Sequence, residues 1–394
     1  MAIAFSVGLY TGVSEWGGSR AAAQSDLFGT GTQPGSINMG QFWQAWNVLD
    51  EHFVQVHAST TLPTDEEKIY GAIAGLTASY GDPYTVFLPP EDAQIFNDDI
   101  SGSFGGVGMD LAQKEGRVTV VAPLKGSPAE AAGVRSGDVV LAVNGTSTES
   151  MSVDQAVKII RGPKGTTVAL TMSRAGVAQP FVVKIVRDTI TIPVINAYAR
   201  GDGVFVIELY SFSQNSAELF RGALRQFFLS GQTKMILDLR GNPGGYLDAA
   251  VDMASYFLPV GDVVVTEDYK GKASNIAHRS LGYNVFANKQ LSMAILVDQG
   301  SASASEILAG ALQQHGVGKL VGQRTFGKGS VQQLVDLGNG AELKITVARW
   351  LTPNGTSISD GGLTPDFTAT TTAKDVAAGK DPQKDAALSW LATQ

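Results

Sequence analysis

The sequence predicts a multidomain α/β protein, and three observations lead to that prediction. The chain has 394 residues, the length of two to three ordinary domains. Hydrophobic residues make up 44% of it, which is enough to form packed cores. The spacing of apolar residues also changes along the chain: it is helical before residue 97, falls in short alternating runs at 98–190, and shows strands alternating with helices at 191–372.

The composition excludes several kinds of site. There are no cysteines, so thiol nucleophiles, disulfides and cysteine-bound zinc are ruled out. The four histidines show no tight ligand spacing, and we therefore expect no metal site. The formal net charge is 29 − 37 = −8 and basic runs are missing, which argues against a nucleic-acid partner.

Residues 1–36 form the first predicted segment. Residues 1–13 are apolar but shorter than the about 20 residues that span a bilayer, and the first basic residue is Arg20. We interpret them as the end of a signal peptide or membrane anchor that starts outside this sequence; an apolar terminus without such a role is the alternative. The Ser-, Gly- and Gln-rich stretch 17–35 is then a linker.

Residues 37–97 are predicted to form an N-terminal helical domain. Apolar residues recur at three-to-four spacing in its first part, at Phe42, Trp46, Leu49 and Phe53. The same spacing returns at 69–76, and the sequence PTDE at 63–66 supplies a turn and a helix N-cap between the two stretches. The sequence PPED at 89–92 starts a further short helix.

Residues 98–190 have the pattern of a small β-rich domain with two helices. Strand-like runs occur at 118–121, 139–143 and 168–172. A short capped helix is expected at 127–133, where it ends on a glycine, and a second at 153–160.

A glycine-rich sequence, GGVGMDL at 105–111, precedes one of these strands. Its backbone N–H groups could hold a carboxylate, although an ordinary hairpin turn has the same composition. Together with the pattern at 126–145, it resembles a PDZ domain of the circularly permuted bacterial kind. Such domains bind the C-terminus of a chain by β-strand addition. The resemblance implies tail-binding residues at Gly106, Val107, Gly108 and Met109.

In residues 191–372 strands and helices alternate, which predicts an α/β core with a central sheet flanked by helices. The expected strands are 203–209, 235–239, 293–297 and 320–321, and the expected helices are 216–229, 247–257 and 303–314. Residues 373–394 form a polar tail with a final amphipathic helix.

Two motifs follow buried strands of this core. The turn LDLRGNPGG at 237–245 can aim backbone N–H groups at an oxyanion, although a tight strand-to-helix turn alone also needs such glycines. The sequence DQGSASASE at 298–306 places serines at a helix start, where the helix dipole favours developing negative charge. An ordinary N-cap looks the same, and local chemistry does not choose among Ser301, Ser303 and Ser305.

The sequence GQRTFGKGS at 322–330 nearly completes a phosphate-binding loop. Gly329 stands where that loop needs a hydroxyl for Mg²⁺, and a strand-like run follows it, so we expect no nucleotide. Lys328 can act as a general base if burial lowers its pKa. A serine–lysine pair needs no histidine.

Taken together, these motifs resemble the carboxyl-terminal processing peptidases, or tail-specific serine proteases, over about residues 40–368. The resemblance includes YGDPYT at 80–85 and TPNG at 352–355. It implies that Ser303 is the nucleophile, that Lys328 is the general base and that Gln332 orients the lysine.

The resemblance also implies an oxyanion hole made by the N–H groups of Ala304 and of a glycine in the NPGG turn. We assign that glycine as Gly244, with Gly245 as the alternative. An arginine of the PDZ domain takes part in switching in such enzymes, and Arg161 is the position that matches; its alternative is a solvated residue beside a turn.

The predicted function is therefore a serine endopeptidase that needs no cofactor or metal and acts on proteins or peptides with free apolar C-terminal tails. The family resemblance implies an extracytoplasmic location, in a bacterial periplasm or cell envelope, with or without a membrane anchor. The amphipathic ends of the chain are compatible with a homodimer. Two other functions are considered: an inactive PDZ scaffold, and a Ser-His-Asp hydrolase that would need His278 or His315 near a serine.

Overall fold

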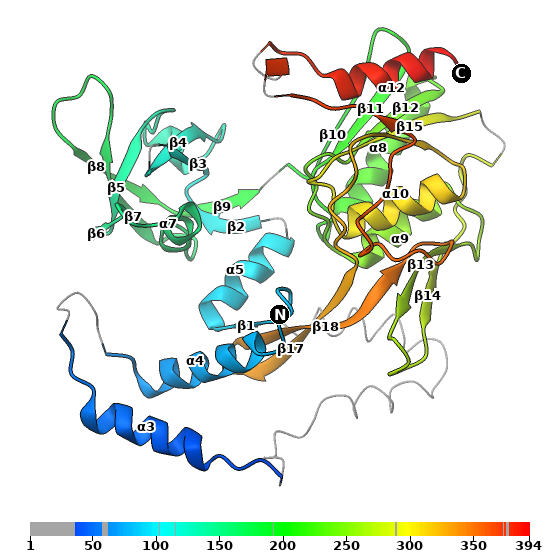
Figure 1. The fold of residues 1–394 in the computed structure, drawn as a ribbon. Helices are drawn as coiled ribbons and strands as arrows, with labels where there is room; N and C mark the ends of the chain where they lie inside the picture. Colours follow the sequence, from blue (N-terminus) through cyan, green and yellow to red (C-terminus); the bar gives the residue numbers. More distant parts are fainter. Residues whose placement is uncertain are drawn as a thin grey trace. The chain divides into compact units, whose positions relative to one another are not determined.

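The computed structural model describes residues 36–56, 62–101, 103–114, 116–191, 193–287, 290–372, 374–375 and 378–394 (Figure 1). The predicted signal or anchor remnant and the linker therefore lie outside the described residues. The chain divides into two compact units, Met1–Gly81 and Asp82–Gln394. Among the described residues, no helix has the length and hydrophobicity needed to cross a membrane.

The first unit contains helices α3 (Gly40–His52) and α4 (Asp65–Ala78). The predicted N-cap of α4 is confirmed: the Glu67 N–H donates to Thr64 Oγ1 at 3.2 Å, and the Thr64 N–H donates to Glu67 Oε2 at 2.6 Å. The apolar residues of α3 that predicted a helix are not buried, and its Leu49 is 60% exposed.

The second unit begins with β1 (Val86–Leu88) and α5 (Pro90–Ser101), followed by the β-rich domain. One sheet of that domain has the order β3 (Met109–Lys114), β4 (Arg117–Pro123), β5 (Val139–Val143), β7 (Thr167–Ser173) and β8 (Phe181–Val186), with β6 (Thr146–Ser147) beside β5. A second sheet pairs β2 (Ser103–Gly106) with β9 (Asp188–Thr191). Helices α6 (Pro128–Ala131) and α7 (Val153–Ile160) lie at the predicted positions, and the domain has its own hydrophobic core.

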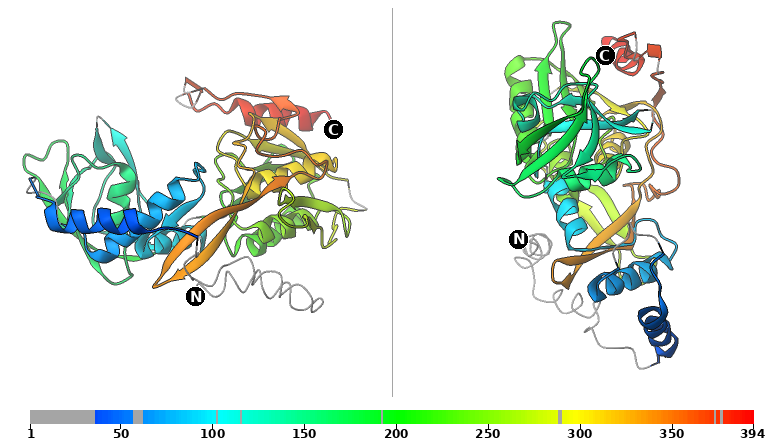
Figure 2. Two further views of the ribbon diagram at one scale, coloured as in Figure 1. Left: turned by 60° about the horizontal axis from the view of Figure 1, so that its bottom comes forward. Right: turned by 90° about the vertical axis from the view of Figure 1, so that its left-hand side faces the viewer.

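The α/β core is built on a six-stranded sheet. Its order is β10 (Ile195–Ala199), β11 (Val204–Leu209), β12 (Lys234–Asp238), β15 (Ser292–Val297), β16 (Lys319–Gly322) and β19 (Phe367–Thr368). All neighbours are parallel except β10 and β11, and parallel strands covered on both faces are apolar along their whole length. One face packs against α8 (Ser216–Ser230), α9 (Leu247–Ser255) and α10 (Ala304–Gln314), and the other against α12 (Pro382–Ala392), as Figures 1 and 2 show.

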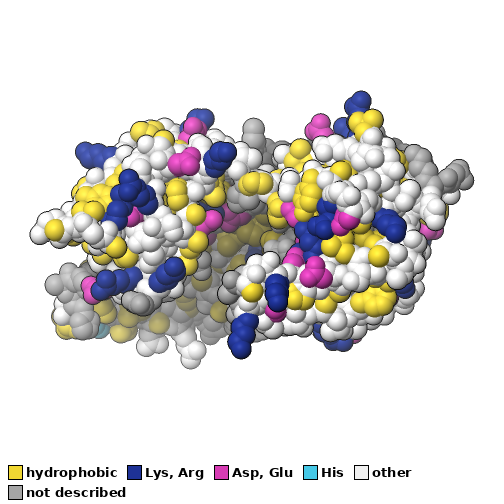
Figure 3. All heavy atoms as spheres, turned by 90° about the horizontal axis from the view of Figure 1, so that it is seen from above, with side chains coloured by type: hydrophobic (Ala, Val, Ile, Leu, Met, Phe, Trp, Pro, Cys, Tyr) yellow, Lys and Arg dark blue, Asp and Glu magenta, His cyan; other side chains and the backbone are white. Residues whose placement is uncertain are grey.

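A five-stranded antiparallel sheet adjoins this core. It contains β1, β13 (Val263–Asp268), β14 (Ile276–Arg279), β17 (Ser330–Gly338) and the long β18 (Ala341–Leu351). Across the described part of the face shown in Figure 3, basic side chains are interspersed with acidic ones. The predicted multidomain α/β fold is confirmed. The candidate site residues of the core lie at or near the ends of strands in these two sheets.

Candidate active site

Ser303 occupies a sharp turn between β15 and α10. Its backbone angles are φ 55° and ψ −118°, in the left-handed region that a residue with a side chain rarely adopts. The turn places Ser303 directly before the first residue of the helix, where unbonded N–H groups and the helix dipole favour negative charge. Strain of this kind persists only where the surrounding contacts enforce it, and it marks Ser303 as a candidate functional residue.

The structure distinguishes the three serines that the sequence left open. Ser301 is 1% exposed and its hydroxyl donates to Leu239 O at 2.8 Å; Ser305 is fully buried and its hydroxyl donates to Asn242 O at 2.9 Å. Ser303 is partly exposed, and no side-chain hydrogen bond of the described residues commits its hydroxyl to another segment of the chain. Ser303 is therefore the one of the three whose side chain is neither buried nor bonded to the turn at Leu239–Asn242.

The glycine turn after β12 packs against this serine. Gly244 has φ +98°, and a Cβ built on it would lie 2.8 Å from Ser303 Cβ and 2.6 Å from Ala302 O. Asn242 is buried and holds the turn in place: its Nδ2 donates to Leu209 O at 2.8 Å, and its carbonyl accepts the Ala302 N–H at 3.0 Å. Gly244 is thus required by close approach as well as by its backbone angle.

The backbone N–H groups of the glycine turn and of the helix start differ in whether they already donate a hydrogen bond. The Gly244 N–H donates to Asn242 Oδ1 at 2.9 Å and is already used within the turn. In contrast, the N–H groups of Gly245 and Ala304 donate in none of the hydrogen bonds formed by the described residues. Gly245 therefore has the free amide, whereas Gly244 is the glycine whose Cβ position lies against Ser303 and Ala304.

Glu306 links the serine turn to the lysine loop. This fully buried carboxylate accepts the Ser303 N–H at 3.0 Å and the Lys328 N–H at 2.9 Å on the same oxygen, Oε2. Its other oxygen accepts the Thr325 hydroxyl at 2.5 Å and the Gly327 N–H at 2.8 Å. Burial raises the pKa of Glu306, and these hydrogen bonds oppose that effect. The sequence analysis missed this role, for which the sequence gives no signal beyond an acid in the first turn of a helix.

Lys328 lies half-buried after β16. Burial lowers the pKa of its ammonium group, and the Glu306 carboxylate acts in the opposite direction. Its Nζ lies 5.6 Å from the ring centroid of Tyr84. Gln332 is on β17, where its amide donates to Ser330 Oγ at 2.6 Å. Among the hydrogen bonds of the described residues, none joins Lys328 Nζ to Ser303 Oγ or to Gln332.

The histidines of the core have partners other than serine. His278 Nε2 lies 2.8 Å from Glu267 Oε1, and His315 Nε2 lies 2.8 Å from Val263 O. Neither arrangement matches a Ser-His-Asp site, in which the imidazole has to reach the nucleophile.

The glycine-rich sequence of the β-rich domain ends at a free sheet edge. Strand β3 is the edge strand of its sheet, and α7 packs beside it. Outside the strands, the N–H groups of Val107 and Gly108 have no backbone acceptor among the described residues. Gly108 has φ +73°, and its carbonyl is fixed by the Ser127 hydroxyl at 2.8 Å. The described residues thus leave two amides without backbone acceptors next to the edge strand β3.

Arg161 ends α7 and faces two other elements. Its guanidinium lies 4.0 Å from the ring centroid of Phe104 on β2, and its Nη1 donates to Asp99 on α5 at 2.6 Å. The side chain is therefore packed and paired, which differs from the solvated alternative.

Comparisons with known proteins identify the family of this chain. The sequence profile of peptidase family S41 matches residues 203–369, and that of a PDZ domain matches residues 119–174. The carboxy-terminal processing protease CtpA of Bacillus subtilis (strain 168) is 36% identical over 322 residues, which are 82% of this chain and 68% of the relative. The chain belongs to peptidase family S41.

Two further comparisons support the assignment. A probable CtpA-like serine protease of Staphylococcus saprophyticus is 36% identical over 356 residues, which are 90% of this chain and 68% of the relative. The structure of the photosystem II D1 C-terminal processing protease is 28% identical and matches with a TM-score of 0.52, covering 84% of this chain and 92% of that one. The predicted family is thus confirmed, and this S41 chain is a serine peptidase with a PDZ domain.

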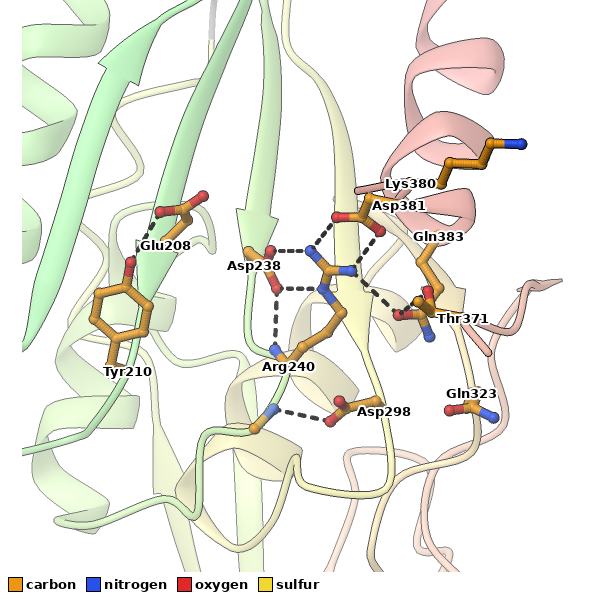
Figure 4. A pocket seen from close by; sticks show the side chains of 11 residues that line it. Glu208, Tyr210, Asp238, Arg240, Asp298, Gln323, Thr371, Lys380, Asp381 and Gln383 are labelled. Atoms are coloured by element: carbon orange, nitrogen blue, oxygen red, sulfur yellow. Dashed lines mark hydrogen bonds and ion pairs between the residues drawn. The ribbon is translucent and has the colours of Figure 1, made fainter. Parts of the chain in front are cut away.

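A polar pocket of this S41 peptidase lies at the carboxyl ends of the sheet strands, where Figure 4 shows the Arg240 guanidinium between two carboxylates. Arg240 Nη2 lies 2.6 Å from Asp238 Oδ2, and its Nη1 lies 2.7 Å from Asp381 Oδ1. Asp381 also accepts the Lys384 N–H at the start of α12. Arg240 belongs to the turn that carries Gly244, so the C-terminal helix is tied to the glycine turn of the site.

Proposed function

We propose that the chain cleaves peptide bonds with a serine–lysine pair, Ser303 and Lys328. The observation that carries the proposal is the bridge made by Glu306: one buried oxygen binds the N–H groups of both residues, at 3.0 and 2.9 Å. A nucleophile and a base have to be held in a fixed relation for proton transfer. Burial supports the basic role, because it lowers the pKa of Lys328 and so increases the neutral fraction of the amine.

In the proposed mechanism, neutral Lys328 takes the proton of Ser303 Oγ as the oxygen attacks the peptide carbonyl. The Ala304 N–H and a glycine N–H of the turn hold the oxyanion; Gly245 has the free amide, and the Gly244 amide would have to leave Asn242 Oδ1 first. The ammonium then protonates the leaving amine, and water releases the acyl-enzyme. For Gln332 to orient the lysine, Lys328 Nζ would donate to the amide oxygen of Gln332, while the Gln332 NH₂ group donates to Ser330 Oγ.

The PDZ domain binds the substrate's free, apolar C-terminal tail in this proposal. The tail adds as a strand to the edge of β3, and its carboxylate meets the N–H groups at Gly106–Met109. Arg161 has a switching role in this proposal, supported by its contacts with Phe104 on β2 and Asp99 on α5. Because these contacts join α7 to β2 and α5, a movement of the groove would change both contacts.

Location, assembly and domain limits complete the proposal. The matched relatives named above are bacterial proteins, and we place this chain outside the cytoplasm, in the periplasm or cell envelope, with a membrane anchor as one arrangement.

We propose a homodimer through the first unit, because Trp43, Leu49 and Phe53 of its helical segment are 54–61% exposed. The proposed domain limits are 37–97, 98–190, 191–372 and 373–394, and residues 82–97 of the first of these belong to the second compact unit.

The test compares one substrate in two forms, an unfolded protein that ends in a free apolar tail and the same protein with its terminal carboxylate amidated. We expect kcat/KM for the free form to rise with pH through the pKa of Lys328, since only the neutral amine accepts the proton. Amidation should reduce kcat/KM, and Lys328→Ala should abolish cleavage while the protein stays folded. Cleavage by Lys328→Ala at a tenth or more of the original rate contradicts the mechanism. Equal rates on the two tails contradict carboxylate recognition.

A further inference from the structure

The sequence DPYT at 82–85 belongs to a motif for which the proposed mechanism has no role. In the structure it lies beside Lys328, the proposed general base. The Tyr84 ring centroid lies 5.6 Å from Lys328 Nζ, within the range of a cation–π contact. We propose that Tyr84 is a positioning residue of the active centre, whose ring face stabilises the ammonium that Lys328 becomes on taking the Ser303 proton. This inference rests on the proposed function, because it needs Lys328 to act as the base.

The turn that carries Tyr84 is fixed by hydrogen bonds at both ends. The Asp82 carboxylate accepts the Tyr84 N–H at 3.2 Å and the Thr85 hydroxyl at 2.6 Å. Thr85 is 9% exposed, and its hydroxyl in turn accepts the Thr346 N–H of β18 at 3.1 Å. These hydrogen bonds fix the turn and therefore hold the Tyr84 ring beside Lys328.

The next residues extend this attachment along the same strand. Strand β1 pairs antiparallel with β18, with Val86 opposite Lys344 and Leu88 opposite Glu342. On its other edge, β18 pairs with β17, the strand that follows Lys328 and carries Gln332. The Gln332 amide lies 3.4 Å from the Thr346 hydroxyl. Strand β18 thus connects the DPYT turn to the strand that follows Lys328 and carries Gln332.

Besides the ring, Glu306 and Lys344 interact electrostatically with Lys328. The Glu306 carboxylate on α10 favours the charged form of Lys328. Lys344 on β18 carries a like charge: burial lowers the pKa of Lys344 most, and the nearby Lys328 lowers it further. Asp82 acts on Lys344 and favours its ammonium. The negative face of an aromatic ring attracts a cation and not a neutral amine, so Tyr84 stabilises the state after proton transfer more than the state before it. A contact that strengthens along the reaction raises kcat.

The test uses Tyr84→Leu, which removes the aromatic ring but keeps an apolar side chain. We expect kcat on the unfolded protein with a free apolar tail to fall about 2- to 30-fold, the range for a cation–π contact. The acid limb of the pH profile should move to lower pH by about 0.4–1.5 units, because the ammonium loses a stabilising neighbour. A merely structural role would change the rate without this displacement.

Two further variants separate the explanations. Tyr84→Phe retains the ring and should recover most of the lost rate. Tyr80→Leu is the matched control, because Tyr80 belongs to the same sequence motif but is 77% exposed, and it should leave the acid limb unchanged. If Tyr84→Leu equals the original enzyme in both kcat and acid limb while Lys328→Ala is inactive, the inference about Tyr84 is wrong and the proposed function stands. If Lys328→Ala is active, the proposed function itself fails, and this inference with it.

Discussion

Replacing Glu306 by glutamine is the most informative single perturbation of this site. The change preserves size and shape but removes a charge and turns one acceptor oxygen into an NH₂ donor. The carboxylate now accepts four hydrogen bonds, from the N–H groups of Ser303, Gly327 and Lys328 and from the Thr325 hydroxyl. Whichever way the new amide turns, its NH₂ group meets at least one buried N–H donor.

The magnitude follows from those four bonds. A buried donor left without an acceptor costs about 1–3 kcal/mol, and loss of the charge weakens each remaining bond by about 1 kcal/mol. Burial raises the pKa of Glu306, so removing the charge also relieves some desolvation, which offsets part of this cost. We expect the free energy of unfolding of the core to fall by about 2–4 kcal/mol, or its melting temperature by about 5–10 °C.

Activity should fall further than stability alone explains. Misplacement of reacting groups by about 1 Å can cost on the order of 100-fold in rate, and Glu306 holds the backbone of both Ser303 and Lys328. Loss of the carboxylate also removes a group that favours the lysine ammonium, so the acid limb of kcat/KM should move to lower pH. The assays are thermal unfolding and a pH–rate profile, both at temperatures where the variant stays folded.

Glu342→Gln is the matched control for this experiment. Glu342 is also buried, at 7% exposed, but its Oε2 has no hydrogen-bond partner in the described structure and its Oε1 accepts only from Asn97, at 3.1 Å. This control should be neutral or stabilising. If Glu306→Gln matches Glu342→Gln in melting temperature and rate, the bridging role of Glu306 is refuted.

Three further predictions concern the glycine turn, the C-terminal helix and the PDZ arginine. Gly244→Ala should reduce kcat more than about 10²-fold, because its Cβ would displace the Ser303 backbone; peptide kinetics measure this. Asp381→Asn should weaken the bond to Arg240 and cost about 1–2 kcal/mol locally, seen as faster hydrogen exchange over α12. Arg161→Ala should change turnover of a tail-bearing substrate but not of a tail-less peptide. Each prediction has one contradicting result. These are normal kinetics for Gly244→Ala, unchanged hydrogen exchange in α12 for Asp381→Asn, and unchanged turnover of the tail-bearing substrate for Arg161→Ala.

The order of elements in the core was largely predictable from its sequence, because each buried parallel strand is a short apolar run followed by an amphipathic helix. The strand expected at 235–239 is β12, Lys234–Asp238, and the helix expected at 153–160 of the PDZ domain is α7. Strand β18 was not predicted, because polar and apolar residues mix along it. It pairs with the preceding strand β17 and also with β1 and β13, which lie far away in the sequence.

The site itself was predicted through family resemblance and not from local chemistry. Ser301, Ser303 and Ser305 are equivalent as a sequence, and only the contacts of Ser301 and Ser305 with the turn near Leu239–Asn242 set Ser303 apart. Glu306 was missed for the same reason: its partners Thr325, Gly327 and Lys328 come from a loop after the next strand. Long-range hydrogen bonds of this kind leave no periodic pattern in a sequence.

The most direct test of the central claim is cleavage of an unfolded protein with a free apolar C-terminus, followed by mass spectrometry, with the original enzyme and Ser303→Ala side by side. Ser303→Ala should fold normally, because no bond to another segment depends on its hydroxyl. Cleavage by the original enzyme alone is the predicted result and identifies the nucleophile. Equal cleavage by both proteins would show that Ser303 is not the reacting serine and would contradict the account.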